Sequence, residues 1–213
     1  MRIELLHFTP IEPMAMATAQ PYQGEGSEKL VERVWKSGHR SIARHGMAMF
    51  HVEGVSQSFL RQVSRHPHVN LTVKSSRYCD MSDAAVAVPP FIKEDDFDMF
   101  MNDYHVIMEI YSRWGDAKGY TKEQQRELSK LMLPLGSGTE MVVSGNYQAL
   151  YEFLQLRICK RAEWEIRMLA EAIAKILSEV MPAIFADMGC KGDEFGFCPE
   201  GRESCGKHPL KAA

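Results

Sequence analysis

The spacing of apolar residues along the chain predicts a mixture of strands and helices. Compact apolar runs are typical of strands buried on at least one face, and they occur at 2–8, 47–53 and 139–144. Apolar residues three and four positions apart predict amphipathic helices at 27–38, 56–65, 94–114, 121–131, 147–157 and 163–180. Two segments have neither period. The first, 9–26, is rich in Pro, Gly and Met and predicts a connection, and the second, 70–78, suits a loop or an irregular strand.

The composition changes after Pro182, where the chain becomes rich in Gly and Cys and is expected to leave the packed domain. The 213 residues are enough for one domain whose core needs no disulfide. We therefore expect a single folded domain at 1–188, followed by a Gly- and Cys-rich tail at 189–213.

Charge and hydropathy exclude several classes of protein. With 45% hydrophobic residues, 25% charged residues and a net charge of −3, the chain is neither disordered nor a globally basic nucleic-acid binder. No apolar run is long enough to cross a membrane, and the N-terminus breaks too early for a signal peptide. Five Cys, an odd count, fit a reducing compartment. We expect a cytoplasmic protein whose partners include no nucleic acid and no membrane.

The charge is unevenly distributed. Residues 33–79 hold eight Lys or Arg against one acid, Glu53, a balance of +7, whereas the rest of the chain carries −10. Within this block, 61–66 and 75–78 combine arginines with small hydroxyls, which suit a phosphate, and Gln62 can pair with a nucleobase edge. The spacing alone leaves two interpretations open: a phosphate site and a solvated basic surface.

Several motifs in this region, taken in order, resemble the flavin-dependent thymidylate synthase (ThyX) family. The family signature is Arg-His-Arg, seven residues, then Ser; Arg65, His66 and Ser75 match it in type and spacing, while Pro67 stands at the second arginine. A second block is similar to the family's C-terminal signature and comprises 133–135, Asn146, 153–157 and 163–167. The similarity covers most of 37–167.

The resemblance implies an α+β fold with a central, mostly antiparallel sheet surrounded by helices, in which 1–188 is the catalytic domain. It further implies a homotetramer whose sites are shared between subunits. The implied reaction is the reductive methylation of dUMP to dTMP, with methylenetetrahydrofolate as carbon donor, NADPH as reductant and FAD as hydride carrier.

The resemblance also implies roles for individual residues. Those expected at dUMP are Gln62, Arg65, Ser75, Ser76, Arg77, Lys130 and Arg157. Among them Arg157 is the catalytic candidate, because a guanidinium stabilises negative charge at the pyrimidine N3 without losing a proton. Those expected at FAD are His39, Ser41, Arg65, His66, Asn146 and Gln148.

Some positions depart from the family pattern. Pro67 and Gln148 stand where flavin-contacting arginines are usual, and Glu152 adds a negative charge near the cofactor. Cations that can compensate are Arg40, Arg44 and Arg161. Two alternatives stay open: a C5-modifying enzyme for another uracil nucleotide, favoured by Lys130 and Thr72, and a nucleotide-binding homologue that has lost catalysis.

The tail offers a second kind of chemistry. Three thiols and an imidazole can form a tetrahedral zinc site, and the candidates are Cys190, Cys198, Cys205 and His208. The usual short Cys-x-x-Cys pair is absent, which favours the alternative of a reduced, mobile tail. We therefore expect no metal.

Overall fold

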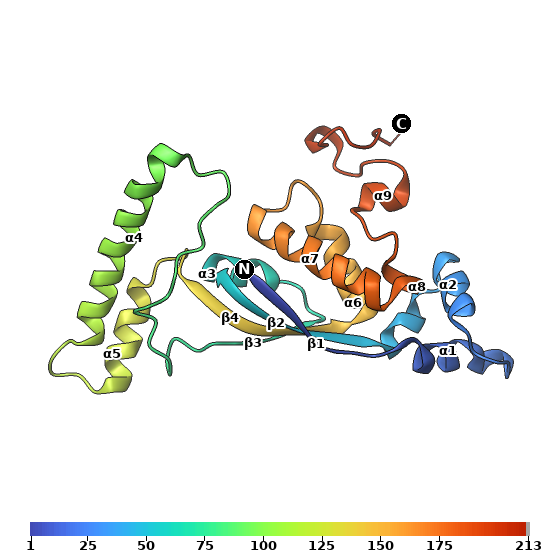
Figure 1. Ribbon diagram of the computed structural model, residues 1–213, viewed down its shortest axis with the longest axis horizontal. Helices are drawn as coiled ribbons and strands as arrows, with labels where there is room; N and C mark the ends of the chain where they lie inside the picture. Colours follow the sequence, from blue (N-terminus) through green and yellow to red (C-terminus); the bar gives the residue numbers. More distant parts are fainter. Residues whose placement is uncertain (212–213) are drawn as a thin grey trace. The chain divides into compact units, whose positions relative to one another are not determined.

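The structure, a computed structural model, describes residues 1–211 and contains one antiparallel sheet (Figure 1). Its strand order is β1-β2-β4-β3, and the strands are β1 (Arg2–Phe8), β2 (Met47–Ser56), β3 (Val69–Val73) and β4 (Gly138–Asn146). Burial alternates residue by residue along β4, as the two-residue period of a strand requires. The predicted α+β class with a largely antiparallel sheet is confirmed.

Helices make up much of the remaining chain. They are α1 (Ile11–Ala19), α2 (Glu28–Lys36), α3 (Gln57–Val63), α4 (Glu94–Gly115), α5 (Lys122–Ser129), α6 (Tyr147–Arg157), α7 (Trp164–Val180), α8 (Pro182–Phe185) and α9 (Lys191–Phe195). Short 3-10 turns lie at η1 (Gln20–Tyr22), η2 (Arg40–His45), η3 (Lys130–Met132) and η4 (Gly201–Glu203). Helix α6 has the bounds that the sequence predicted. The observed bounds of α2, α4, α5 and α7 differ from the predicted ones only at the helix ends. No helix of the described part of the chain has the length and apolar character that a membrane crossing needs.

The chain divides into two compact units, each with its own packing. The first unit contains residues 1–2, 52–62 and 72–141, and in it α4 and α5 pack together. A small cluster of buried side chains belongs to it: Met81, Tyr104, Met108 and Tyr111. The second unit contains residues 3–51, 63–71 and 142 to the end of the described residues, and in it α6 packs on α7 (Figure 1). Strands β2 and β4 contribute residues to both units.

The second unit holds most of the large buried side chains. They come from α1, β2, α6, α7 and α8, and include Met14, Phe50, Tyr147, Leu150, Phe153, Leu154, Ile166, Leu169, Ile173, Leu177 and Phe185. Helices α6 and α7 bury one face each at the three-to-four spacing that predicted them. This packing holds the N-terminus of α6, at Asn146, and its C-terminus, at Arg157, at fixed positions within the unit.

Two expectations were wrong, the connection at 9–26 and the end of packing at Pro182, and the helix expected at 56–65 is present but shorter. The connection expected at 9–26 contains helix α1. Pro13 is its third residue, in the first turn, where a backbone N–H has no partner within the helix and its loss costs nothing. The Pro-rich composition therefore concealed a helix start.

The helix expected at 56–65 ends earlier, at Val63. The backbone N–H of His66 donates to the carbonyl of Val63 at 3.1 Å, so the chain turns at this point. Arg61 and Arg65 therefore do not share a helix side, and Arg65 is placed by a turn between α3 and β3.

The chain also stays packed beyond Pro182. Helix α8 packs on α2 and α7 and buries Ala183, Ile184 and Phe185. Pro182 takes the first helical position, which its fixed φ suits. The apolar residues 183–185 therefore keep the chain packed after the proline, although a Gly-rich stretch follows them.

Candidate functional site

The N-terminus of α6 forms one wall of a pocket in the second unit. Strand β4 ends at Asn146, whose side-chain oxygen accepts a hydrogen bond from the backbone N–H of Ala149 at 2.9 Å and so caps the helix. The pocket has a volume of about 370 Å³ and is lined by Arg44, His68, Asn146, Gln148, Ala149 and Glu152. The helix N-terminus and Arg44 favour an anionic group in this pocket, whereas the carboxylate of Glu152 opposes one.

Three side chains of this pocket form a hydrogen-bonded row. The Nε–H of Arg44, from η2, donates to Oε1 of Gln148 at 2.7 Å, and the amide Nε2 of Gln148 donates to Oε1 of Glu152 at 2.9 Å. The amide thereby separates a guanidinium from a carboxylate. The family pattern has an arginine at the position of Gln148. In this chain, Arg44 supplies a positive charge beside that position.

The C-terminus of α6 brings together two predicted site residues. The Nε–H of Arg157 donates to Nε2 of His66 at 2.9 Å, and the His66 ring packs edge-on against Phe153 with ring centroids 4.8 Å apart. Because Nε2 accepts this bond, the imidazole is neutral and carries its proton on Nδ1. Burial, and then the charge of Arg157, lowers the pKa of His66, which favours the same neutral form.

Arg65 lies close enough to act on Arg157. Burial is the main cause that lowers the pKa of Arg157, and the positive charge of Arg65 is the second. Two neighbouring guanidinium groups repel each other unless an anion lies between them. The arrangement of Arg65, His66 and Arg157 is therefore suited to bind a negatively charged ligand.

The first unit contains the remaining predicted nucleotide residues. The Ser75 hydroxyl accepts a hydrogen bond from the backbone N–H of Arg77 at 3.3 Å, which shapes the loop after β3. The guanidinium of Arg77 pairs with Glu123 at 3.0 Å and Glu127 at 3.3 Å, both on α5. Lys130 follows α5 in η3, and Gln62 lies near the end of α3. Within this unit, α5 and the 75–77 loop are thus held together by charge.

Comparison with known proteins identifies the family. The model of the thymidylate synthase complementing protein family matches residues 4–183. A flavin-dependent thymidylate synthase of Nitratidesulfovibrio vulgaris is 31% identical, with 99% of this chain and 96% of the relative covered. The chain belongs to the flavin-dependent thymidylate synthase family.

Two further comparisons agree with this assignment. A flavin-dependent thymidylate synthase of Thermococcus kodakarensis is 33% identical, with 94% of this chain and 89% of the relative covered. The crystal structure of a ThyX enzyme from Helicobacter pylori, complexed with FAD and dUMP, superposes with a TM-score of 0.74 at 23% identity and covers 89% of this chain and all of that one. The structural likeness extends the family assignment to the fold.

The residues that the family resemblance assigns to FAD all lie in the second unit. Asn146 and Gln148 line the 370 Å³ pocket. His66 lies with Arg157, as described above, and His39 and Ser41 lie at and within η2, the turn that also carries Arg44. Their contacts with a flavin stay predictions.

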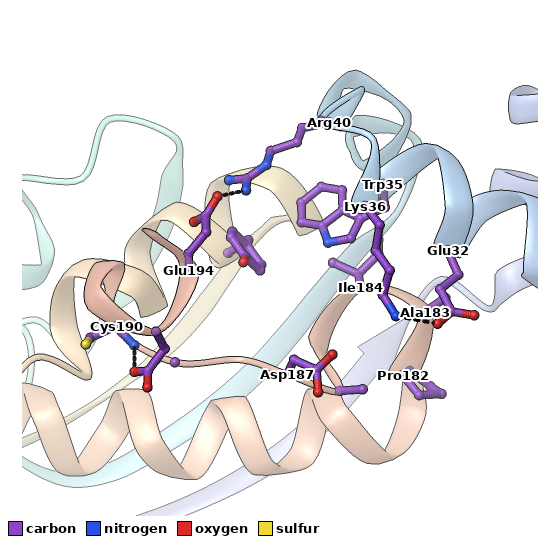
Figure 2. A pocket seen from close by; sticks show the side chains of 15 residues that line it. Glu32, Trp35, Lys36, Arg40, Pro182, Ala183, Ile184, Asp187, Cys190 and Glu194 are labelled. Atoms are coloured by element: carbon purple, nitrogen blue, oxygen red, sulfur yellow. Dashed lines mark hydrogen bonds and ion pairs between the residues drawn. The ribbon is translucent and has the colours of Figure 1, made fainter. Parts of the chain in front are cut away.

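The sequence offered three cations that can compensate for the missing flavin-contacting arginines. Arg44 lines the pocket at the N-terminus of α6. Arg161 instead pairs with Glu200, and Arg40 pairs with Glu194 of α9. Arg40 also stacks over Trp35 and Tyr151 and borders a different pocket of about 520 Å³ (Figure 2). His68 also lines the pocket, although no spacing signal in the sequence pointed to it.

The four zinc candidates of the tail are not gathered as one set. Cys190 and His208 lie together, joined by Asp193, which was not among the expected ligands. Within the described chain, Cys198 and Cys205 are outside this group. All five cysteines are free thiols.

Proposed function

We propose that the chain converts dUMP to dTMP as a flavin-dependent thymidylate synthase, with methylenetetrahydrofolate as carbon donor and NADPH as reductant. Family membership along nearly the whole chain supports the reaction. The observation that carries the proposal to this chain's own residues is the Arg65, His66 and Arg157 arrangement, in which Arg157 donates to a neutral imidazole and lies within electrostatic range of Arg65.

The pocket at the N-terminus of α6 fits part of an FAD molecule. Arg44 and the capped helix end both favour a diphosphate, and the Gln148 amide offers a further donor and acceptor. The residues that would hold FAD are His39, Ser41, Arg65, His66, Asn146 and Gln148, with Arg44 added by the structure. FAD supplies the hydride transfer when it is bound.

The residues of the chain position the nucleotide and place charge. Arg157 stabilises the negative charge that develops at N3 of the pyrimidine, and it does so without giving up a proton. His66 accepts the Nε–H of Arg157 and so fixes the plane of the guanidinium. We assign Gln62, Arg65, Ser75, Ser76, Arg77 and Lys130 to binding of dUMP, with Arg77 exchanging its carboxylate partners for phosphate oxygens.

Further assignments follow from the family. We infer a homotetramer with shared sites, because Arg65 is expected at both the nucleotide and the flavin and different subunits can supply these two roles. Five free cysteines support a cytoplasmic location. The family match ends at residue 183, which supports a catalytic domain at 1–188 followed by a tail at 189–213 that lies beyond the family model.

Flavin binding is the property to test first. The purified protein should be yellow, and titration of the colourless form with FAD should show saturable quenching of flavin fluorescence at micromolar concentrations. A protein that purifies without flavin and binds none in this range would contradict the proposal and favour a homologue that has lost catalysis.

A further inference from the structure

Three potential metal ligands meet where the end of the described chain returns to α9. Cys190 is the residue before α9, Asp193 is the third residue of that helix, and His208 comes from the segment after η4. One ligand atom from each, the Cys190 sulfur, an Asp193 oxygen and a His208 ring nitrogen, lies within 4.8 Å of the other two. Small shifts suffice to place all three around one ion.

Gly189 and Gly192 have no side chain, and this leaves room for the side chains of Asp193 and His208. A Cβ at Gly192 would lie 2.5 Å from Cδ2 of His208, and a Cβ at Gly189 would lie 2.6 Å from Oδ2 of Asp193. Any other residue at either position would push a ligand side chain away. The Gly-rich composition of this segment therefore serves the close approach of His208 and Asp193.

The contacts of the Asp193 carboxylate hold one of its oxygens close to the ring nitrogen of His208. Oδ2 of Asp193 accepts the backbone N–H of Cys190 at 2.9 Å, which fixes the carboxylate. Oδ1 lies 3.2 Å from Nε2 of His208 and 2.6 Å from the ammonium of Lys207. Nε2 of His208 is shielded from solvent, and its contact with Oδ1 does not have hydrogen-bond geometry. A shielded imidazole nitrogen beside a carboxylate and a thiol is a set of donors that suits a cation.

We propose that Cys190, Asp193 and His208 bind a zinc ion. A set of one sulfur, one imidazole nitrogen and one carboxylate oxygen is the combination that Zn²⁺ accepts, with water at the fourth tetrahedral position. Binding displaces the proton of the Cys190 thiol to solvent and the Lys207 ammonium from Oδ1. Cys198 acts through its backbone, since its N–H donates to the carbonyl of Pro209 at 2.7 Å and closes the loop that returns His208.

The site joins the tail to the folded unit. Cys190, Asp193 and Glu194 line the 520 Å³ pocket that Arg40 also borders, and Glu194 pairs with Arg40 (Figure 2). An ion held by Asp193 and His208 therefore fixes α9 while Glu194 engages Arg40. Zinc is expected to protect the segment after α9 from proteolysis.

Zinc titration of the full chain tests the proposal. After removal of metal with a chelator, the protein is titrated with Zn²⁺ against a chromogenic competitor, and Co²⁺ is used separately to detect thiolate ligation by its charge-transfer band. We expect one ion per chain and a cobalt–thiolate band. The variants Cys190→Ser and His208→Gln should each weaken binding by about tenfold or more, the scale of loss caused even by supporting residues.

Matched variants distinguish this ligand set from others. Cys198→Ser and Cys205→Ser each remove a tail thiol outside the cluster and should leave the affinity unchanged, and Lys207→Gln should leave it equal or tighten it. Circular dichroism establishes that each variant is folded. Absence of stoichiometric zinc binding at micromolar concentration would overturn the proposal, and so would a Cys198→Ser or Cys205→Ser variant that weakens binding as much as Cys190→Ser. Neither result bears on flavin binding or turnover, which are measured separately.

Discussion

The Nε–H of Arg157 donates a hydrogen bond to Nε2 of His66 at 2.9 Å across 91 positions of sequence. The family resemblance assigns Arg157 to the nucleotide and His66 to the flavin. Their direct contact means that the orientation of the guanidinium depends on the protonation state of the imidazole, because a protonated Nε2 would repel the Nε–H. One hydrogen bond therefore links the residue that we propose for the nucleotide to the residue that we propose for the flavin.

Replacing Arg157 should affect turnover more than folding. Arg157→Ala removes charge stabilisation at the pyrimidine, which is expected to lower kcat by roughly 100-fold or more. The loss of one charge-assisted hydrogen bond should lower the free energy of unfolding by no more than about 1–3 kcal/mol. Steady-state kinetics and urea unfolding measure the two effects. The control is Arg161→Ala, which removes an arginine four residues along; a loss of turnover fully accounted for by unfolding of Arg157→Ala would contradict the assigned role.

Stability in acid should depend on His66. Burial, and then the charge of Arg157, lowers the pKa of His66 below its ordinary value of 6.5. As the pH falls through 6.5, the unfolded chain takes up a proton that the folded chain binds less well, so this contribution to stability is complete above 6.5 and is lost below it.

Ligand-free protein is the material for this test. The free energy of unfolding of the wild type should fall more steeply between about pH 7 and pH 5 than that of His66→Gln, which has no imidazole to titrate. Exposed His7 provides the matched control, since His7→Gln should keep the wild-type slope. Equal slopes for His66→Gln and the wild type would show that His66 does not contribute.

Arg44 should contribute to flavin affinity. Arg44→Gln removes the cation from the pocket at the N-terminus of α6, and the loss of one charge-assisted contact should weaken FAD binding by about tenfold. Glu152→Gln should act in the opposite direction, because it removes the negative charge at the other end of the hydrogen-bonded row. Fluorescence titration gives both affinities. Arg161→Gln serves as control, and an effect of that change as large as that of Arg44→Gln would indicate general attraction rather than a specific contact.

Gly46 should be essential to packing in the second unit. A Cβ there would lie 2.4 Å from the ring of Tyr147, which is fully buried and whose hydroxyl donates to the carbonyl of Thr9. Gly46→Ala should lower the free energy of unfolding by about 1–3 kcal/mol, the usual cost of overpacking. Gly24→Ala, where a Cβ meets nothing within 4 Å, should change it by less than about 0.5 kcal/mol. Similar values for the two variants in thermal or urea unfolding would refute this packing account.

Local signals predicted most of the elements. Thr121 and Gln124 form a capping box at the start of α5, and the apolar faces of α6 and α7 follow the helical period along their length. Helix α1 was missed because Pro13 suggests a break, although the first turn tolerates it. The end of α3 was misplaced because Ser64 and Arg65 are compatible with a helix, and the turn is set by packing beyond it.

The sequence predicted which residues belong to the candidate site but not which of them contact one another. Motif spacing selected His66 and Arg157, but their hydrogen bond is a tertiary contact that no local pattern encodes. The partners of Arg40 and Arg161 are likewise acids far along the chain, Glu194 and Glu200. Local sequence therefore indicated which cations are present, while packing decides which of them, such as Arg44, remain available to a ligand.

Release of tritium from C5-labelled dUMP tests the central claim most directly. We predict release that requires FAD, NADPH and methylenetetrahydrofolate together, is matched by formation of dTMP, and does not occur from labelled UMP. Release from UMP alone, or no release from dUMP by protein saturated with FAD, would contradict the assignment.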